Sequence, residues 1–296
     1  MNNRIVFIVN PISGKGKGKE IKPIIEDFFK NTTHQIDIIF AEYAGHAKEI
    51  VKQQIKLNPS VIVACGGDGT ISEVAESLVG TAIPLGILPI GSGNGLASNL
   101  NISKDIKQAL QTILAYNIKT IDVGKVNENY FFSNIGLGID AKVIHRYTEK
   151  KQRNFVGYFK ATIWSFLNYN PINYAISFDG LECKNNDYFF VLCSNSNEAG
   201  YGISFTPNAK LNDGKIDVIC VERLNALQYL KFFYAVLFKK LDAFDQAILK
   251  QVKKVVFKTD KKSLQMQIDG EAVIFETNRI EVSVVPQSLS VVVEAN

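Results

Sequence analysis

Residues that build metal clusters or disulfide frameworks are scarce in this chain, and long apolar runs are missing. It has four cysteines, three histidines and one tryptophan in 296 residues. The cysteines are widely separated and lack the paired spacing of a zinc site or of a disulfide-rich fold. No apolar run approaches the ~18 residues of a membrane-spanning helix. The first apolar strand begins at Arg4, without a signal-peptide pattern before it. These absences favour a soluble protein of a reducing compartment.

A strong excess of charge of one sign is also missing. The formal net charge is +4, and 46% of the residues are hydrophobic and 21% charged, as in an ordinary globular protein. Proteins that bind nucleic acid usually carry a strongly basic face, so nucleic acid is not an expected partner. The length allows one large domain or two domains of ordinary size.

What the first part of the chain does contain is a repeated order of strand, glycine loop and helix. Apolar, strand-like runs end at Asn10, Cys65 and Ile90, and a glycine-rich loop and a helical pattern follow each of them. This alternation predicts a parallel sheet with helices on both faces. The carboxyl ends of such strands share one edge, where ligands bind. We therefore expect the three loops to converge, and bare backbone N–H groups beside helix N-termini favour phosphate as the ligand.

Asp68 stands out in the central loop, Gly66-Gly67-Asp68-Gly69-Thr70, because a carboxylate repels phosphate. A bridging Mg²⁺, or a network that orients this ion, would remove the conflict. The alternative is a tight turn in which Asp68 caps the following helix. Two nucleotide-binding motifs do not fit. A P-loop needs Gly, four residues and then Gly-Lys-Ser/Thr, but Lys19 follows five residues after Gly14 and is itself followed by Glu20. A dinucleotide fingerprint needs Gly-x-Gly-x-x-Gly, but the loops at 14–18 and 91–95 both read Gly-x-Gly-x-Gly.

Beyond residue 125 the pattern changes to strands in which apolar and polar residues alternate, with helical stretches near 139–168 and 224–249. The expected strands are Tyr130–Asn134, Tyr174–Phe178, Tyr188–Ser194, Lys215–Val221, Ser263–Ile268, Arg279–Val285 and Leu289–Glu294. We therefore predict two domains: a Rossmann-like α/β domain over 1–125, to which the last strand is free to return, and an antiparallel β-rich domain over 126–296.

Two acidic motifs in the second half are candidates for chemistry. Ile268-Asp269-Gly270-Glu271 places two carboxylates at a strand end, where Asp269 could accept a proton from an attacking hydroxyl. Asn208–Lys215 could hold a hard cation through Asp213 and nearby carbonyls. From the pattern alone an ordinary turn is favoured in both places, with solvated acids in the first.

Basic residues followed by aromatic residues over 145–166, and the aromatic-rich stretch Leu227–Phe238, suit a membrane interface. The more usual explanation of such a pattern is a core helix with a solvated cationic face. The sequence alone favours this second interpretation.

Four motifs, taken in order, resemble the diacylglycerol kinase and sphingosine kinase superfamily, in particular its small soluble bacterial lipid kinases. The motifs are Asn10-Pro11 with Ser13-Gly14, Gly66–Thr70 with Glu73-Val74, Leu88–Asn94, and Asp269-Gly270-Glu271. The resemblance covers nearly the whole chain. It implies an N-terminal α/β domain that holds ATP and a C-terminal β-sandwich domain. It also implies that a lipid hydroxyl is phosphorylated in the cleft between them.

The resemblance also implies roles for single residues. Asp269 matches the proton acceptor of the family, and Asp68 and Glu271 are the other implied catalytic residues. Asp140 aligns with a residue that contacts the lipid head. The implied contacts to the nucleotide phosphates are Asn10, Gly14, Gly66, Gly67, Asp68, Gly69, Thr70, Ile71, Ser72, Gly91, Ser92, Gly93 and Asn94.

The resemblance further implies a magnesium site away from the chemistry. This site takes Asp213 and the backbone carbonyls of Lys210 and Lys215, and Asp122 matches an aspartate that links the metal to the active site.

Two positions depart from the family pattern. Ala41 stands where the family usually has a threonine that contacts the nucleotide. Gly95 stands where bacterial diacylglycerol kinases usually have an aspartate, and the local pattern is closer to sphingosine or ceramide kinases. This departure weakens the prediction that diacylglycerol is the substrate, but it does not affect the prediction that the chain is a kinase.

We therefore predict a lipid kinase that uses ATP and Mg²⁺ and acts on diacylglycerol or a sphingoid lipid. It is expected to be cytoplasmic and peripheral to the membrane that presents its substrate. The oligomeric state is open, and a homodimer is one option. An NAD kinase resembles the chain at Gly66–Thr70, but the downstream Ser-Ala-Gly-Gly-type signature is missing. A non-catalytic module that senses nucleotide or lipid is the other alternative.

Overall fold

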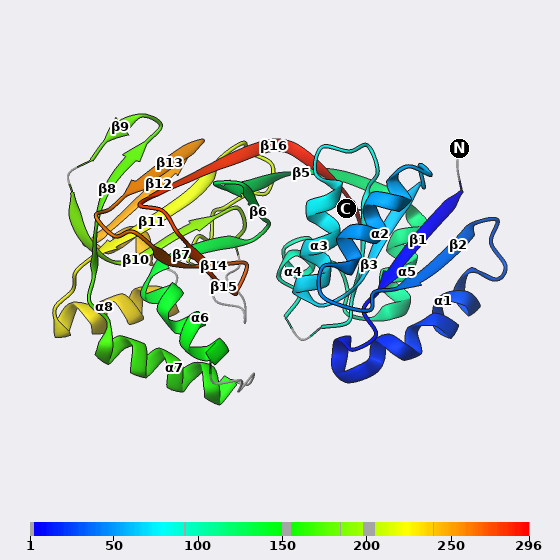
Figure 1. The fold of residues 1–296 in the computed structure, drawn as a ribbon, viewed down its shortest axis with the longest axis horizontal. Helices are drawn as coiled ribbons and strands as arrows, with labels where there is room; N and C mark the ends of the chain where they lie inside the picture. Colours follow the sequence, from blue (N-terminus) through cyan, green and yellow to red (C-terminus); the bar gives the residue numbers. More distant parts are fainter. Residues whose placement is uncertain are drawn as a thin grey trace. The chain divides into compact units, whose positions relative to one another are not determined.

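Two strands, β5 (Asn117–Val126) and β16 (Arg279–Val293), run between two separately packed units of the chain. The computed structural model describes residues 3–91, 93–149, 155–183, 185–197, 205–238 and 240–295. The first unit contains the residues up to Val123 and the segment from Pro286, and the second unit is Gly124–Val285 (Figure 1).

The first unit is built on a parallel sheet with the strand order β2–β1–β3–β4, and the end of β16 lies beyond β4. These strands are β1 (Arg4–Val9), β2 (Gln35–Phe40), β3 (Val61–Gly66) and β4 (Leu85–Pro89). β3 and β4 are buried along their whole length, as expected when helices cover both faces of a sheet. The predicted α/β fold with a parallel sheet is confirmed.

Amphipathic helices cover this sheet. They are α1 (Ile21–Phe29), α2 (His46–Ile55), α3 (Asp68–Leu78) and α5 (Ile106–Ala115), and the short α4 (Gly95–Asn99) follows β4. α1 contacts α5, whereas α2 contacts α3, so the two pairs lie on opposite faces. The order of strands reverses between β1 and β3, and ligands of open α/β sheets bind at such a reversal.

The second unit is an antiparallel β-sandwich, as predicted. One layer contains β7 (Asn134–Gly138), β10 (Asn186–Ser194), β11 (Ile216–Glu222), β12 (Ala247–Val252), β14 (Leu264–Ile268) and β15 (Glu271–Phe275). The other contains β6 (Asn129–Phe131), β8 (Ile172–Phe178), β9 (Leu181–Glu182), β13 (Lys254–Lys258) and the second-unit parts of β5 and β16.

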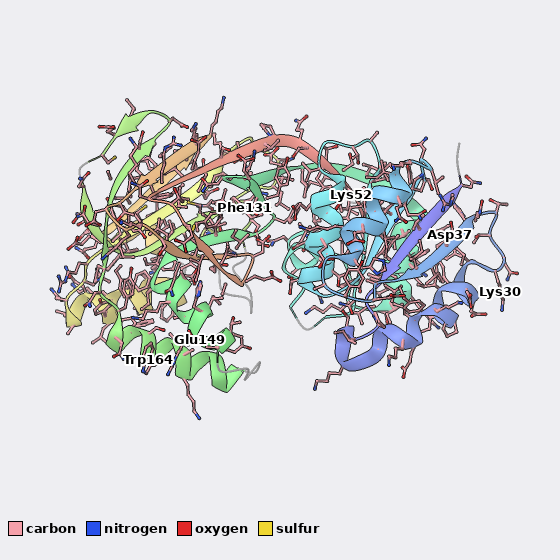
Figure 2. All side chains as sticks on the ribbon, in the orientation of Figure 1. Lys30, Asp37, Lys52, Phe131, Glu149 and Trp164 are labelled. Carbon is pink, nitrogen blue, oxygen red and sulfur yellow. The ribbon has the colours of Figure 1, made fainter. Side chains whose placement is uncertain are left out.

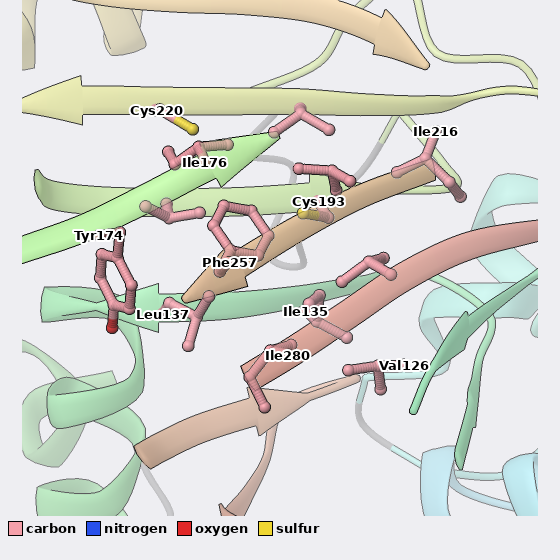
Figure 3. Packing of buried hydrophobic residues seen from close by; sticks show 14 of the residues in the cluster. Val126, Ile135, Leu137, Tyr174, Ile176, Cys193, Ile216, Cys220, Phe257 and Ile280 are labelled. Atoms are coloured by element: carbon pink, nitrogen blue, oxygen red, sulfur yellow. The ribbon is translucent and has the colours of Figure 1, made fainter. Parts of the chain in front are cut away.

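The core of the second unit lies between these two layers, where Tyr174, Phe257 and Ile280 pack together (Figure 3). The other face of β10 packs against α6 (Ile139–Glu149), α7 (Phe155–Asn168) and α8 (Ala226–Leu237). β10 is thus covered on both sides, which explains its almost continuous apolar sequence. In the part of the chain that the structure describes, no helix has the length and apolar character needed to cross a bilayer.

Several predicted boundaries are wrong. Tyr130–Asn134 is not one strand, because the chain leaves β6 after Phe131 and enters β7 at Asn134. The helical stretch predicted to residue 249 ends with α8 and the short 3₁₀ turn Leu241–Ala243, and β12 follows. The two strands predicted near the end form the single strand β16. The loop after β1 contains short 3₁₀ segments within Ser13–Glu20, which are interrupted where Gly14, Lys15 and Gly16 take positive φ values.

Gly124 in β5 lies opposite the buried Phe131 of β6, and the ring of Phe131, labelled in Figure 2, covers the place of a Cβ at Gly124. We expect Gly124→Ala to lower the free energy of unfolding by about 1–3 kcal/mol, because the added methyl group overpacks this contact. Adding Phe131→Leu gives room, so the double variant should lose less than the sum of the two single changes. Urea unfolding of the three variants measures these values, and strictly additive losses would contradict the contact.

Candidate functional site

Hydrogen bonds join the three loops that follow β1, β3 and β4. The backbone N–H of Asn10 donates to the carbonyl of Cys65 (3.0 Å), and that of Ile90 donates to the carbonyl of Gly66 (2.9 Å). The side-chain Nδ2 of Asn10 also donates to Oγ1 of Thr70 in the first turn of α3 (3.1 Å). The predicted convergence of the glycine loops is therefore confirmed.

These loops approach each other so closely that side chains cannot stand between them. Gly14 has a φ of +61°, and a Cβ there would lie 2.6 Å from the carbonyl oxygen of Ile90. A Cβ on Gly91 would lie 2.5 Å from the Cα of Gly67. Only glycine fits at Gly14 and Gly91, so main chain meets main chain where the loops join.

The helix α3 starts directly at this meeting point. Gly67 precedes it in an extended conformation and, being glycine, has no side chain to cap the first turn. The first N–H groups of a helix have no partner within it, and the helix dipole places partial positive charge beside them. The start of α3 can therefore bind an anion.

The Asp68 carboxylate connects α3 to the third loop. Its Oδ2 accepts the N–H of Asn94 (2.9 Å), and its Oδ1 accepts the N–H of Gly95 (2.6 Å). The Cα of Gly93 lies against the same carboxylate, where a Cβ would collide with Oδ2. Asp68 does not cap its own helix. It positions the neighbouring loop, whose N–H groups compensate its charge.

The remaining phosphate-contact candidates lie in different environments. Asn94 is buried in the left-handed region, with a φ of 62°, and its Nδ2 donates to the carbonyl of Gly91 (2.6 Å). Ile71 is buried too, and its N–H donates to the carbonyl of Gly67, so its side chain packs in the core.

Gly69 and Ser72 belong to the first turns of α3, where Gly69 is exposed and Ser72 half-buried. Ser92 lies outside the described residues. The main chain of the three loops is therefore the part of this region that is best arranged to meet a ligand.

In the second unit, Asp269 and Gly270 form the two-residue turn between β14 and β15, and Ile268 pairs with Glu271 across it. Both turn residues have a positive φ, 47° and 84°, as in a type I′ turn. Glu271 is exposed, whereas Asp269 is half-buried. The predicted turn is present at this place.

The carboxylate of Asp269 is not simply solvated, because three backbone N–H groups bind it. Its Oδ2 accepts from Phe132 (2.8 Å), and its Oδ1 accepts from Ser133 (2.7 Å) and Asn134 (3.0 Å). These donors are the reason why the strand predicted over Tyr130–Asn134 is interrupted. Charge-assisted bonds of this kind hold the carboxylate in one orientation.

Gln267 joins this turn to β7 and α6. Its side chain is 3% exposed. Its Nε2 donates to Oδ1 of Asn134 (2.7 Å) and to Oδ2 of Asp140 (2.9 Å), and its Oε1 accepts the N–H of Gly270 (2.8 Å). Asp140, the candidate lipid-head contact, and Asp269, the candidate proton acceptor, therefore belong to one hydrogen-bond network.

Asp140 lies in the first turn of α6 with its carboxylate against the Cα of Gly136, where no Cβ fits. Burial raises the pKa of Asp140 to about 6, although the hydrogen bond from Gln267 acts in the opposite direction. A carboxyl group that changes its charge near neutral pH is typical of functional sites.

The candidate metal ligands make ordinary hydrogen bonds. The Oδ1 of Asp213 accepts the N–H of Lys215 (3.1 Å), as in an Asx turn. Asp122 is 1% exposed and accepts the N–H of Gln287 (2.8 Å). Nowhere in the described ranges are three or more His, Cys, Asp or Glu side chains grouped to hold a metal ion. The magnesium site that includes the Lys210 and Lys215 carbonyls stays a prediction.

Sequence reasoning did not identify Gln267 or Asn134. The alternation through Leu264, Met266 and Ile268 assigns Gln267 to the outer face of β14, but α6 packs on β14 and buries it. The available signal is the order of strand, glycines and helix at 134–140, which repeats the arrangement of the first half.

Comparison with known families places both units. Residues 4–126 match the diacylglycerol kinase catalytic domain, and residues 133–293 match the YegS C-terminal NAD kinase beta sandwich-like domain. A diacylglycerol kinase of Staphylococcus aureus (strain MRSA252) is 27% identical over 276 residues, covering 92% of this chain and 87% of that protein. One of Staphylococcus saprophyticus is 28% identical over 230 residues, covering 76% and 75%.

Solved structures show the same fold. A protein of Bacillus anthracis str. Sterne, described as a diacylglycerol kinase, superimposes with a TM-score of 0.71 at 19% identity, covering 99% of this chain and 97% of that chain. An NAD kinase of Archaeoglobus fulgidus in complex with ATP is more distant, with a TM-score of 0.54 at 13% identity and coverage of 98% and 93%. With a family match to each unit and the glycine loops in the order that the motifs predict, the chain belongs to the superfamily of diacylglycerol kinases and sphingosine kinase-like proteins.

Proposed function

We propose that this chain is an ATP-dependent kinase that phosphorylates a hydroxyl group of a lipid, either diacylglycerol or a related sphingoid lipid. The observation that carries the proposal is the meeting of three glycine loops with the start of α3, at the point where the strand order reverses. The family to which the chain belongs implies the use of ATP. The relatives named diacylglycerol kinase support a lipid as the acceptor.

The first unit fits a polyphosphate. Phosphate oxygens are expected to accept hydrogen bonds from the main chain of Gly66–Gly69 and from the loop after β4, where glycine excludes side chains. The hydrogen bond between the side chains of Asn10 and Thr70 holds two of these loops together. ATP, when bound, supplies the phosphoryl group, and the role of these residues is to orient it.

In the second unit, Asp269 is the proposed acceptor of the proton from the lipid hydroxyl. Its three backbone donors hold the carboxylate in one orientation, towards which the lipid hydroxyl can deliver its proton. Gln267 and Asp140 keep the turn that carries Asp269 in place. Together with Glu271 they are the proposed neighbours of the lipid substrate. Mg²⁺, when bound, neutralises charge on the phosphates. Asp68 is the residue we propose beside this ion. A separate magnesium site, away from the chemistry, is proposed at Asp213 with the Lys210 and Lys215 carbonyls, and Asp122 keeps the linking role that the family resemblance implies.

Two other functions compete with this one. An NAD kinase shares the fold at low identity, and a sensing module would bind nucleotide and lipid without turnover. Transfer of labelled γ-phosphate from ATP, measured with diacylglycerol, sphingosine, ceramide and NAD as acceptors, separates all three. Transfer to a lipid supports the proposal. Transfer to NAD alone, or to none of these acceptors despite ATP binding, contradicts it.

Asp269→Asn tests the proton acceptor. The amide keeps the shape of the side chain but loses its charge, so we expect turnover to fall by about 10²–10⁴-fold while ATP binding stays unchanged. Glu276→Gln, the same chemical change at an exposed position beyond β15, is the matched control and should retain activity. Turnover of Asp269→Asn within a few-fold of the wild type would remove Asp269 from this role.

Asp68→Ala tests the positioning of the third loop. The N–H groups of Asn94 and Gly95 lose their charged acceptor, and such bonds are worth about 1.5–3 kcal/mol each. We expect ATP affinity, measured by calorimetry, to fall more than about tenfold. Asp105→Ala also removes a carboxylate that accepts a helix N–H, at the start of α5, and should lower stability without changing ATP affinity. Equal affinity losses in both variants would contradict the assignment.

Asp140→Asn tests the raised pKa of Asp140. The folded chain holds the Asp140 proton more tightly than the unfolded chain, because the pKa rises from 3.8 to about 6. This contribution to stability is complete below pH 4 and is lost as pH rises through 6. The wild type should therefore lose about 2 kcal/mol between pH 4 and 7 relative to the variant. Urea unfolding at several pH values measures this difference, and parallel curves would contradict it.

A further inference from the structure

The helix α8 is apolar on both faces, although the second unit covers only one of them. Phe232 and Ala235 are buried in the cluster beneath the helix. The opposite side exposes five large apolar residues: Leu227 (63%), Leu230 (68%), Phe233 (43%), Tyr234 (54%) and Phe238 (59%). At helical spacing these five side chains form one continuous surface, here named the outer face of α8. A helix that is apolar all round is usually buried, so this face is expected to have a partner.

The outer face is held on a well-formed helix. Asn225 and Gln228 form a capping box, with the Gln228 N–H donating to Asn225 Oδ1 (3.0 Å) and the Asn225 N–H donating to Gln228 Oε1 (2.8 Å). The ring of Phe166 in α7 contacts Tyr229 and Phe233, with centroid distances of 4.4 and 5.4 Å. The apolar surface is therefore fixed in place by α7, which runs beside it.

One cation lies at the edge of this surface, and two more lie on α6 beside the indole of α7. Lys231 is exposed at its edge, and no acidic residue occurs between Asn225 and Phe238. On α7, the indole of Trp164, which is labelled in Figure 2, is 40% exposed. The Arg146 guanidinium lies over this ring at 4.2 Å. Lys142 lies 5.4 Å from the same ring. Indoles and cations of this kind suit the headgroup layer of a membrane.

Charge also argues against a second copy of the chain as the partner. A two-fold contact through this surface would bring Lys231 towards its own equivalent, with no acid on the outer face to pair with it. The acid at the neighbouring end of α6, Glu149, already lies 3.5 Å from Arg146. Anionic lipid phosphates would supply the missing negative charge.

We propose that the outer face of α8, together with Trp164, docks on the surface of an anionic lipid bilayer. The apolar side chains enter the boundary between headgroups and acyl chains, and Lys231, Arg146 and Lys142 meet lipid phosphates. The evidence for this surface is independent of the phosphate site. Its use, bringing the enzyme to a lipid acceptor, rests on the proposed function.

Vesicle co-sedimentation of the full chain, without ATP, tests this surface. The wild type should bind vesicles of phosphatidylcholine and phosphatidylglycerol. Leu227→Ser/Leu230→Ser should bind at least about tenfold more weakly, because two exposed leucines no longer enter the bilayer. Lys231→Gln should weaken binding to these vesicles but not to pure phosphatidylcholine. Leu181→Ser, at a 76% exposed leucine of β9, and Lys262→Gln, at an exposed lysine before β14, are the matched controls and should bind like the wild type.

Binding of the double serine variant at wild-type strength would overturn the proposal. So would a wild-type dimer in sedimentation equilibrium that this variant loses, because the partner would then be a second copy. Circular dichroism and urea unfolding check that the overall helix content and the stability of the variant are unchanged. Phosphorylation of a water-soluble short-chain diacylglycerol, which needs no docking, should be unchanged in the variant. If the wild type does not phosphorylate this soluble diacylglycerol, the result counts against the proposed function. The docking surface is then still tested by vesicle binding.

Discussion

The hydrogen bonds from the backbone of Asn94 and Gly95 to the Asp68 carboxylate are the interaction on which the candidate site depends. They join the start of α3 to the loop after β4, and the two donor residues lie 26 and 27 positions after Asp68 in the sequence. Without them the loop after β4 would have no charged anchor on α3. The glycines around Asp68 then have a clear purpose, because Gly93 leaves space for the carboxylate and Gly91 for the neighbouring main chain.

The second unit uses the same device at Asp269. A carboxylate beside a glycine again collects backbone N–H groups from a distant segment, here residues 132–134, up to 137 residues away. Both acids thereby order a loop through its main chain. This arrangement fixes a carboxylate without a cationic side chain, whose flexible end would position it less firmly.

How far the sequence could reveal these features depends on where the information lies. Glycine spacing after Asn10, Cys65 and Ile90 marks strand ends, so the convergence of three loops follows from the rules of parallel sheets. The partners of Asp68 and Asp269 are backbone N–H groups, which every residue except proline carries. No pattern of side chains in the sequence can therefore predict them. Gln267 was missed because alternation describes a strand with one covered face, and α6 covers the other.

The return of the chain to the first unit has a consequence for the order of folding. From Pro286 onwards the chain belongs to the first unit, where Ser288 accepts the N–H of Gly80 and Val291 pairs with Leu85 of β4. During synthesis the edge of β4 therefore stays unpaired until β16 has been made, which is after more than half of the chain has followed. An open edge of this kind can pair with other chains, so interrupted translation should yield an N-terminal fragment that is prone to aggregation.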